Sequence, residues 1–190
     1  KIPMLKFFLK KELIWVPFLG IAWWALDFPF MKRYSKARIK ANPKLKGKDL
    51  ERTKKACAKF RHTPVSVMNF VEGTRFTKSK HLSQQSRFHH LLKPKAGGIA
   101  FVLGAMGDCL HKLINITIVY PGGIPTFWDY ISGRVKSIII DIDVMPITDE
   151  LLGDYFNDPD YKDNFFNWLN RMWQDKDKKI ADLMRETISN

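Results

Sequence analysis

The stretch VSVMNFVEGTRFT, residues 65–77, decides the fold of this chain and the place of its chemistry. Residues 65–71 are rich in β-branched and aromatic side chains and predict a strand, which ends in the turn Glu72-Gly73-Thr74-Arg75. Glycine frees backbone N–H groups to approach a ligand, Thr74 supplies a hydroxyl, and the Arg75 guanidinium has a fork shape that suits phosphate. With Glu72 holding that guanidinium in place, the turn is predicted to bind an anion.

Four residues alone also allow a solvated turn whose Glu and Arg pair at the surface. The longer stretch, however, resembles the F-x-E-G-T-R block of the glycerolipid acyltransferase family, which includes the lysophosphatidic acid acyltransferases. The continuation through His81 is similar to the longer-loop branch of that family. Other blocks of the family occur in the same order: K-x-E-L at residues 10–13, P-F-x-G at 17–20, a short block ending in Arg33, P-K-x-G at 94–97 and a strand-end proline at Pro121.

The resemblance implies a substrate and a site. The reaction is acyl transfer from acyl-CoA or acyl-acyl-carrier-protein to the free hydroxyl of lysophosphatidic acid or a related lysophospholipid, a step of phospholipid biosynthesis. No cofactor is implied besides that acyl co-substrate. We expect the acceptor phosphate to meet Arg75, Arg33 and Lys10, with Glu72 and Gly73 shaping the turn and Thr74 contributing its hydroxyl. Weaker candidates are Lys95 and Pro121.

The family's catalytic block is missing from this sequence. In the family, the His of an H-x-x-x-x-D block removes the proton of the acceptor hydroxyl and the Asp orients the His. No Asp stands five residues after any His of the chain: His62, His81, His89, His90 and His111. We therefore assign no catalytic residue and expect negligible turnover from this chain alone. Either the chain starts downstream of the block, or the block has been lost and the chain is a non-catalytic anionic-lipid-binding module on the same fold.

Composition points to a membrane surface. The 190 residues, 45% of them hydrophobic, fit a single domain over residues 1–190, and the net charge of +13 implies an anionic partner. Six Trp and fourteen Phe interleaved with cations suit a headgroup boundary, whereas no nucleic-acid recognition motif is present. We expect association with an anionic membrane at its cytoplasmic face, the inner membrane if bacterial or the endoplasmic reticulum if eukaryotic.

Several other sequence patterns say less about the function. The uncharged run Leu13–Leu26 is too short to span a bilayer, and it fits either a buried core segment or one that dips into lipid. Cys57 and Cys109 allow at most one disulfide, which favours a reducing compartment. The histidines at 81, 89 and 90 lack nearby carboxylates or thiols, so we expect no metal. Nothing in the sequence indicates an oligomeric state.

Helical and strand patterns alternate along the chain and predict an α/β fold, a layered αβα acyltransferase-type domain with a largely parallel sheet. From Tyr161 to Ile188, apolar residues recur on one face of an amphipathic helix, which we expect to dock on the sheet. The other expected elements are a helix at 5–13, a strand at 23–31, a helix at 47–61, a long polar loop at 77–92, a helix at 96–110 and strands at 115–120 and 135–144.

Overall fold

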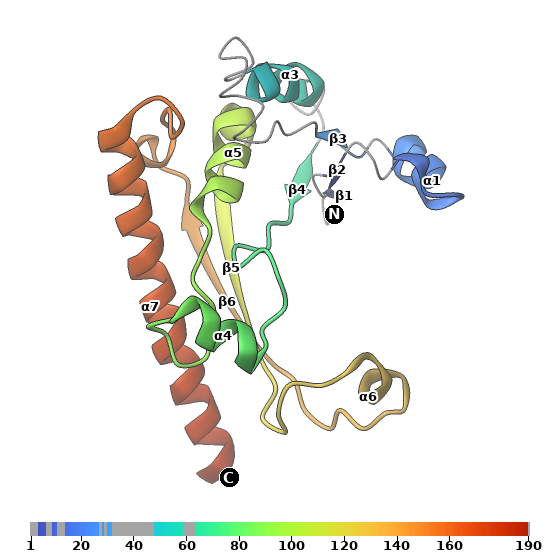
Figure 1. Ribbon diagram of the computed structural model, residues 1–190, viewed down its shortest axis with the longest axis vertical. Helices are drawn as coiled ribbons and strands as arrows, with labels where there is room; N and C mark the ends of the chain where they lie inside the picture. The colour runs from blue at the N-terminus through green and yellow to red at the C-terminus, as the bar shows by residue number, and fades with distance from the viewer. Residues whose placement is uncertain are drawn as a thin grey trace. The chain divides into compact units, whose positions relative to one another are not determined.

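The computed structural model describes residues 4–6, 9–10, 14–26, 28, 30–31, 48–58 and 64–189 (Figure 1). The chain divides into two compact units, which we describe separately. Unit 1 holds the described residues of Lys1–Val71, Ala96–His111 and Thr148–Lys162. Unit 2 holds those of Glu72–Lys95, Lys112–Ile147 and Asp163–Asn190. A single domain over residues 1–190 therefore stays a prediction.

Short parallel strand pairs organise the first part of unit 1. Strand β1 (Met4–Lys6) pairs with β4 (Val65–Val67), and β2 (Leu9–Lys10) pairs with β3 (Phe30–Met31). The helix predicted for residues 5–13 is therefore wrong at β1 and β2. Pairing with strands distant in sequence outweighs the local helix preference of the Met, Leu and Lys residues in β1 and β2.

Helix α1 (Leu19–Ala25) occupies half of the uncharged run Leu13–Leu26. The strand predicted for 23–31 is correct only at its end, in β3, because α1 continues to Ala25. Several large side chains of this segment are exposed: Trp15, Phe18, Leu19, Ile21 and Trp24. Within the described residues, no helix is both long enough and apolar enough to cross a bilayer.

Helices α3 (Lys48–Cys57) and α5 (Ala96–Met106) form the core of unit 1 with β4. Cys57 and Met106 are buried against Val65 and Val67 of β4. Because α5 is apolar on all sides, seven of its eleven residues are buried, as in a central helix. The helices predicted at 47–61 and 96–110 are thus confirmed over most of their length. Two short 3₁₀ turns complete the unit, at Gly107–Cys109 and Asp149–Leu151.

Unit 2 is built on a long antiparallel hairpin. Strands β5 (Lys112–Val119) and β6 (Ile139–Pro146) pair over their full length, with Lys112 opposite Pro146 and Val119 opposite Ile139. Side chains alternate between a face that includes buried Thr117 and Val119 and a face of exposed aliphatic residues. The predicted mixture of helix and strand is confirmed, but a single, largely parallel sheet is not shown, because the longest described pairing is antiparallel.

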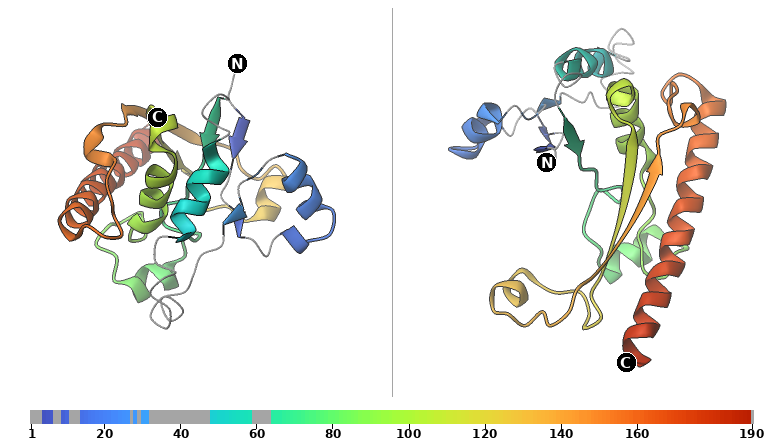
Figure 2. Two further views of the ribbon diagram at one scale, coloured as in Figure 1. Left: turned by 90° about the horizontal axis from the view of Figure 1, so that it is seen from above. Right: turned by 180° about the vertical axis from the view of Figure 1, so that it is seen from behind.

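Helix α7 (Pro159–Ser189) contains the residues 161–188 expected to be helical, and it runs along the β5–β6 hairpin (Figures 1 and 2). Its buried apolar side chains are spaced by four or seven residues and so lie on one face: Phe165, Leu169, Trp173 and Ile180. Lys179 Nζ reaches Asp141 and Asp143 of β6, at 2.7 Å from each. Two smaller helices also belong to unit 2, α4 (Lys78–Gln84) and α6 (Phe127–Ile131).

Candidate anion-binding site

The turn that follows β4 is shaped by Gly73. Its φ of 68° lies in the left-handed region, which glycine enters without the strain that a Cβ would bring. A Cβ built at this position would stand 3.4 Å from both Cδ and Nζ of Lys95. The Lys95 side chain therefore lies against the bare backbone of Gly73, and its ammonium is close to the turn.

A second lysine reaches the same turn from α4. Lys80 Nζ donates to Thr74 Oγ1 at 2.7 Å and to the Arg75 carbonyl oxygen at 3.2 Å. Because the Thr74 hydroxyl oxygen accepts from Lys80, its own hydrogen is left to donate elsewhere. Lys80 thus both fixes the turn and adds a positive charge to it.

Lys80 was not among the site residues predicted from the sequence, because residues 77–92 were expected to be a loop. That expectation is wrong at residues 78–84, which form α4. Thr77 caps the helix by accepting from the backbone N–H of Lys80 at 3.2 Å. A Thr at the start of this segment is an N-cap signal, and it would have placed Lys80 in the first turn of a helix.

Three cationic side chains therefore gather around residues 73–75: Arg75, Lys80 and Lys95. Arg75 and Lys95 are exposed, and Lys80 is half-buried. Within the described part of the chain, none of the three forms an ion pair with a carboxylate. Cationic side chains of different length that have no carboxylate partner are suited to bind a compact anionic group such as a phosphate.

Glu72 does not hold the Arg75 guanidinium, which corrects the prediction made for it. Its Oε1 accepts the backbone N–H of Leu92 at 3.0 Å. Burial raises the pKa of Glu72 above its ordinary value, against the smaller lowering effects of the Leu92 hydrogen bond and the charge of Lys176. Glu72 therefore ties the turn to the segment at residue 92, and Arg75 is left open to solvent.

Helix α7 braces that segment. Trp173 Nε1 donates to the Leu92 carbonyl oxygen at 3.0 Å, and both carboxylate oxygens of Asp177 accept backbone N–H groups, from His89 at 2.8 Å and His90 at 2.7 Å. Asp177 is 8% exposed, so these are buried, charge-assisted bonds. The partners are more than eighty residues apart, and no local pattern could have predicted the pairing.

Lys176 lies on the same helix, between the brace and the hairpin. Its Nζ donates to Asn115 Oδ1 at 2.8 Å and to the Ile116 carbonyl oxygen at 2.7 Å. Burial lowers the pKa of Lys176, while the charges of Glu72, Asp143 and Asp141 act to raise it. Since burial dominates the pKa of both Lys176 and Glu72, their mutual attraction is the weaker effect at each.

The structure says less about the other residues predicted for the site. Lys10 lies in β2 of unit 1, where its Cα pairs with that of Met31, and Arg33 falls outside the described residues. Pro121 is half-buried and follows the end of β5. The roles predicted for these three residues stay predictions, as do the ligand-binding roles of residues 72–75 and Lys95.

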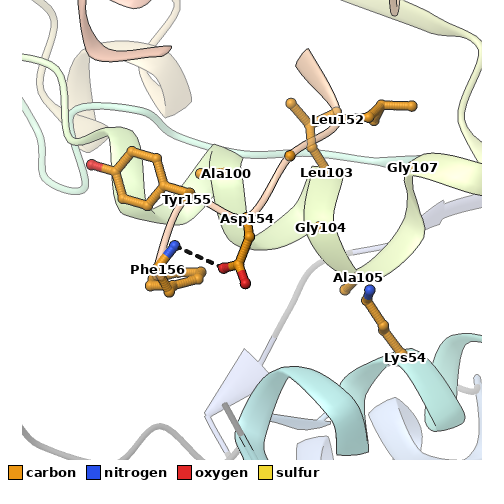
Figure 3. A pocket seen from close by; sticks show the side chains of 11 residues that line it. Lys54, Ala100, Leu103, Gly104, Ala105, Gly107, Leu152, Asp154, Tyr155 and Phe156 are labelled. Carbon is orange, nitrogen blue, oxygen red and sulfur yellow. Dashed lines mark hydrogen bonds between the residues drawn. The ribbon is translucent and has the colours of Figure 1, made fainter. Parts of the chain in front are cut away.

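A pocket of about 240 Å³ lies in unit 1, between one side of α5 and the segment 152–156 (Figure 3). Lys54 points toward it from α3, and Asp154 Oδ1 accepts the backbone N–H of Phe156 at 3.2 Å beside it. None of the residues predicted for phosphate binding lines this pocket. It therefore adds nothing to the candidate site.

Comparison with known proteins identifies the family. The Acyltransferase family matches residues 2–120. The 1-acyl-sn-glycerol-3-phosphate acyltransferase delta of Mus musculus is 26% identical over 180 residues, covering 88% of this chain but 42% of that protein. The protein of the same name from Homo sapiens is 24% identical over 177 residues, with the same coverage, 88% of this chain and 42% of that protein.

An uncharacterized acyltransferase of Saccharomyces cerevisiae is 27% identical over 202 residues, covering 92% of this chain and 50% of that protein. The chain thus spans half or less of the length of these relatives, and no solved structure matches it. The family match covers more than half of the chain and includes the turn at residues 72–75. The chain therefore belongs to the acyltransferase family.

Proposed function

We propose that the turn at residues 72–75 binds the phosphate of a lysophospholipid, in a protein that transfers an acyl group from acyl-CoA or acyl-acyl-carrier-protein to the free hydroxyl of that lipid. Lysophosphatidic acid or a close relative is the proposed acceptor. The observation that carries the proposal is the group of three cations, Arg75, Lys80 and Lys95, around a glycine turn with no carboxylate paired to them in the described residues.

Acyl transfer from a thioester requires that the acceptor hydroxyl be positioned and deprotonated. The donor is already activated, so the protein must hold the acceptor hydroxyl, take its proton and stabilise the oxyanion that forms. A clamp on the acceptor phosphate supplies the positioning. The family's His, which would take the proton, and the Asp, which would orient it, do not occur at the required spacing in the 190 residues. For this chain alone we propose phosphate binding with negligible turnover.

A second candidate with the same phosphate clamp is an anionic-lipid-binding module without catalysis. Both candidates share the phosphate clamp and a location at a cytoplasmic membrane surface, and both are compatible with a layered αβα domain. They differ in whether an upstream H-x-x-x-x-D block exists in the reading frame. An acyl-transfer assay on a longer version of the chain that carries such a block separates them, because only the first candidate gives acylated product.

The clamp itself is tested by binding, which does not require catalysis. The 190-residue chain is titrated with lysophosphatidic acid, whose phosphate is a monoester, and with lysophosphatidylcholine, whose phosphate is capped by choline. We expect tighter binding of the monoester, and we expect Arg75→Ala to weaken that binding about tenfold or more, the value of one charge-assisted contact.

Arg171→Ala is the matched control, since Arg171 is an exposed arginine of the same unit that lies on α7. Its substitution should leave the affinity within about twofold, a change too small to signal a lost contact. Equal affinities of the Arg75→Ala and Arg171→Ala proteins for lysophosphatidic acid would remove Arg75 from the site.

A further inference from the structure

The connection between β5 and β6 displays large apolar side chains to solvent. In unit 2 it leaves the end of the hairpin and carries α6, which stands away from α7 in both views (Figures 1 and 2). We call its exposed apolar side chains the tip patch. Its members are Ile124 at 66% exposure, Phe127 at 67%, Trp128 at 68%, Tyr130 at 44% and Ile131 at 63%.

The tip patch lies on and beside α6, a helix held by hydrogen bonds at both ends. Thr126 and Asp129 form a reciprocal capping box at the start of α6, in which Asp129 Oδ2 accepts the Thr126 N–H at 2.7 Å. At the other end, Ser132 Oγ donates to the Trp128 carbonyl oxygen at 2.6 Å, and Arg134 Nε bonds Ser132 Oγ at 2.9 Å and Asp129 Oδ1 at 3.0 Å. These contacts hold both ends of α6, the helix on which Phe127, Trp128 and Ile131 are exposed.

Charge beside the tip patch favours an anionic partner. Arg134 is 65% exposed at its side chain, and the neighbouring Lys136 is also exposed. The one acidic residue between Ile124 and Lys136, Asp129, is paired with Arg134, so the two cations and one carboxylate of this stretch leave a net charge of +1. Aromatic rings, aliphatic side chains and flanking cations are the combination that lies at a lipid headgroup boundary.

The five side chains of the tip patch expose less area than the whole of a stable protein interface buries. A stable protein interface buries about 800 Å² on each side. Five side chains that are each about half to two-thirds exposed offer roughly 500 Å² in total, taking about 150–250 Å² for a whole aromatic side chain. A bilayer imposes no such minimum and needs no complementary shape, since apolar side chains can enter it singly.

We propose that the tip patch inserts into the headgroup region of an anionic bilayer and anchors unit 2 at the membrane surface. The inference goes beyond the phosphate clamp, because it concerns a different surface of unit 2 and a bulk lipid phase. The inference rests on the proposed function in one respect: a protein that acylates a lipid must meet that lipid at a membrane. Binding at the tip patch and binding at residues 72–75 can therefore fail independently.

The test uses vesicles that contain no lysophospholipid, prepared from phosphatidylcholine with and without phosphatidylglycerol. Partitioning of the whole 190-residue chain is measured by co-sedimentation. The double variant Phe127→Ser/Trp128→Ser removes both rings and keeps the capping box of α6. We expect its partition coefficient on the anionic vesicles to fall about tenfold or more, through the loss of inserted apolar area.

The matched control is Leu82→Ser/Phe166→Ser, which removes two exposed apolar side chains elsewhere in unit 2, from α4 and α7. It should bind as the unaltered chain does. A second readout uses a conservative substitution. Lipid brominated near the headgroup should quench the tryptophan fluorescence of the unaltered chain more than that of Trp128→Phe, because only the unaltered chain has a tryptophan at the tip.

Equal partitioning of the tip and control variants, or equal quenching of the unaltered and Trp128→Phe chains, would overturn the inference. A change of oligomeric state in the tip variant with unchanged vesicle binding would also overturn it, in favour of a second copy of the chain as the occupant. In each of these cases, retained binding of lysophosphatidic acid in the titration above would leave the proposed function standing.

Discussion

Replacing Asp177 by Asn tests whether α7 braces the segment behind the candidate site. Asp177 is buried and accepts two backbone N–H groups, from His89 at 2.8 Å and His90 at 2.7 Å. Asn keeps one acceptor oxygen, but it turns an NH₂ group toward the second N–H. The change therefore removes one charge-assisted hydrogen bond and weakens the other. It also places the NH₂ group of Asn opposite a backbone N–H, so that two buried donors face each other.

The size of the effect follows from those two bonds. A hydrogen bond to a charged group contributes about 1.5–3 kcal/mol, and an unpaired buried donor costs about 1–3 kcal/mol. We expect Asp177→Asn to lower the free energy of unfolding by about 3 kcal/mol. With a urea dependence of about 2 kcal/mol per molar, the unfolding midpoint should fall by about 1.5 M.

The assay is urea unfolding followed by circular dichroism, with Asp175→Asn as the control. Asp175 is an exposed carboxylate on the same helix, and its replacement should change the free energy by less than about 0.5 kcal/mol. Hydrogen exchange adds a local readout, since the amides of His89 and His90 should lose protection. Equal midpoints for the two variants, with those amides still protected, would refute the brace.

Three further predictions concern the turn and the hairpin. Because burial raises the pKa of Glu72, its contribution to stability is present below its ordinary value of 4.5 and is lost as the pH rises through the folded pKa. Glu72→Gln should therefore reduce the fall in urea midpoint between about pH 4 and about pH 7, and superimposable pH profiles would contradict this. Gly73→Ala should lower the free energy of unfolding by about 1–2 kcal/mol, because the φ of residue 73 is 68°. Gly122→Ala should be near neutral in the same unfolding assay, because a Cβ at residue 122 would meet open space and its φ is not positive. Thr117 Oγ1 is buried, and within the described residues it has no hydrogen-bond partner, so Thr117→Val should raise the unfolding free energy by about 1 kcal/mol; a clear loss of stability would show that the hydroxyl is satisfied.

The sequence predicted the elements whose pattern is long and self-consistent. The apolar run at 96–106 predicts α5 because a buried helix needs no polar face, and the spacing of Phe165, Leu169, Trp173 and Ile180 predicts α7 because one stripe must face the core. The turn at Gly73 was also predictable from its glycine, although the strand predicted for residues 65–71 ends in the structure at Val67.

The elements that the sequence did not predict depend on distant partners. Residues 4–6 are a strand because β4 lies beside them, and their own propensity does not decide it. Glu72 was expected to pair with the nearby Arg75, but its bond to Leu92 gives the turn a second attachment point. Asp177 was unpredictable for the same reason, because its partners lie more than eighty residues earlier in the chain.

The contacts of α7 also set where the chain can be shortened or fused. Trp173, Lys176, Asp177 and Lys179 each bind a segment from an earlier part of the sequence. A C-terminal truncation that ends the chain before Trp173 would remove all of these anchors and should yield insoluble protein on expression. The last turns of the helix, from Asp182 to Thr187, are largely solvent-facing, so they can carry an affinity tag or a fluorescent reporter at little cost to folding.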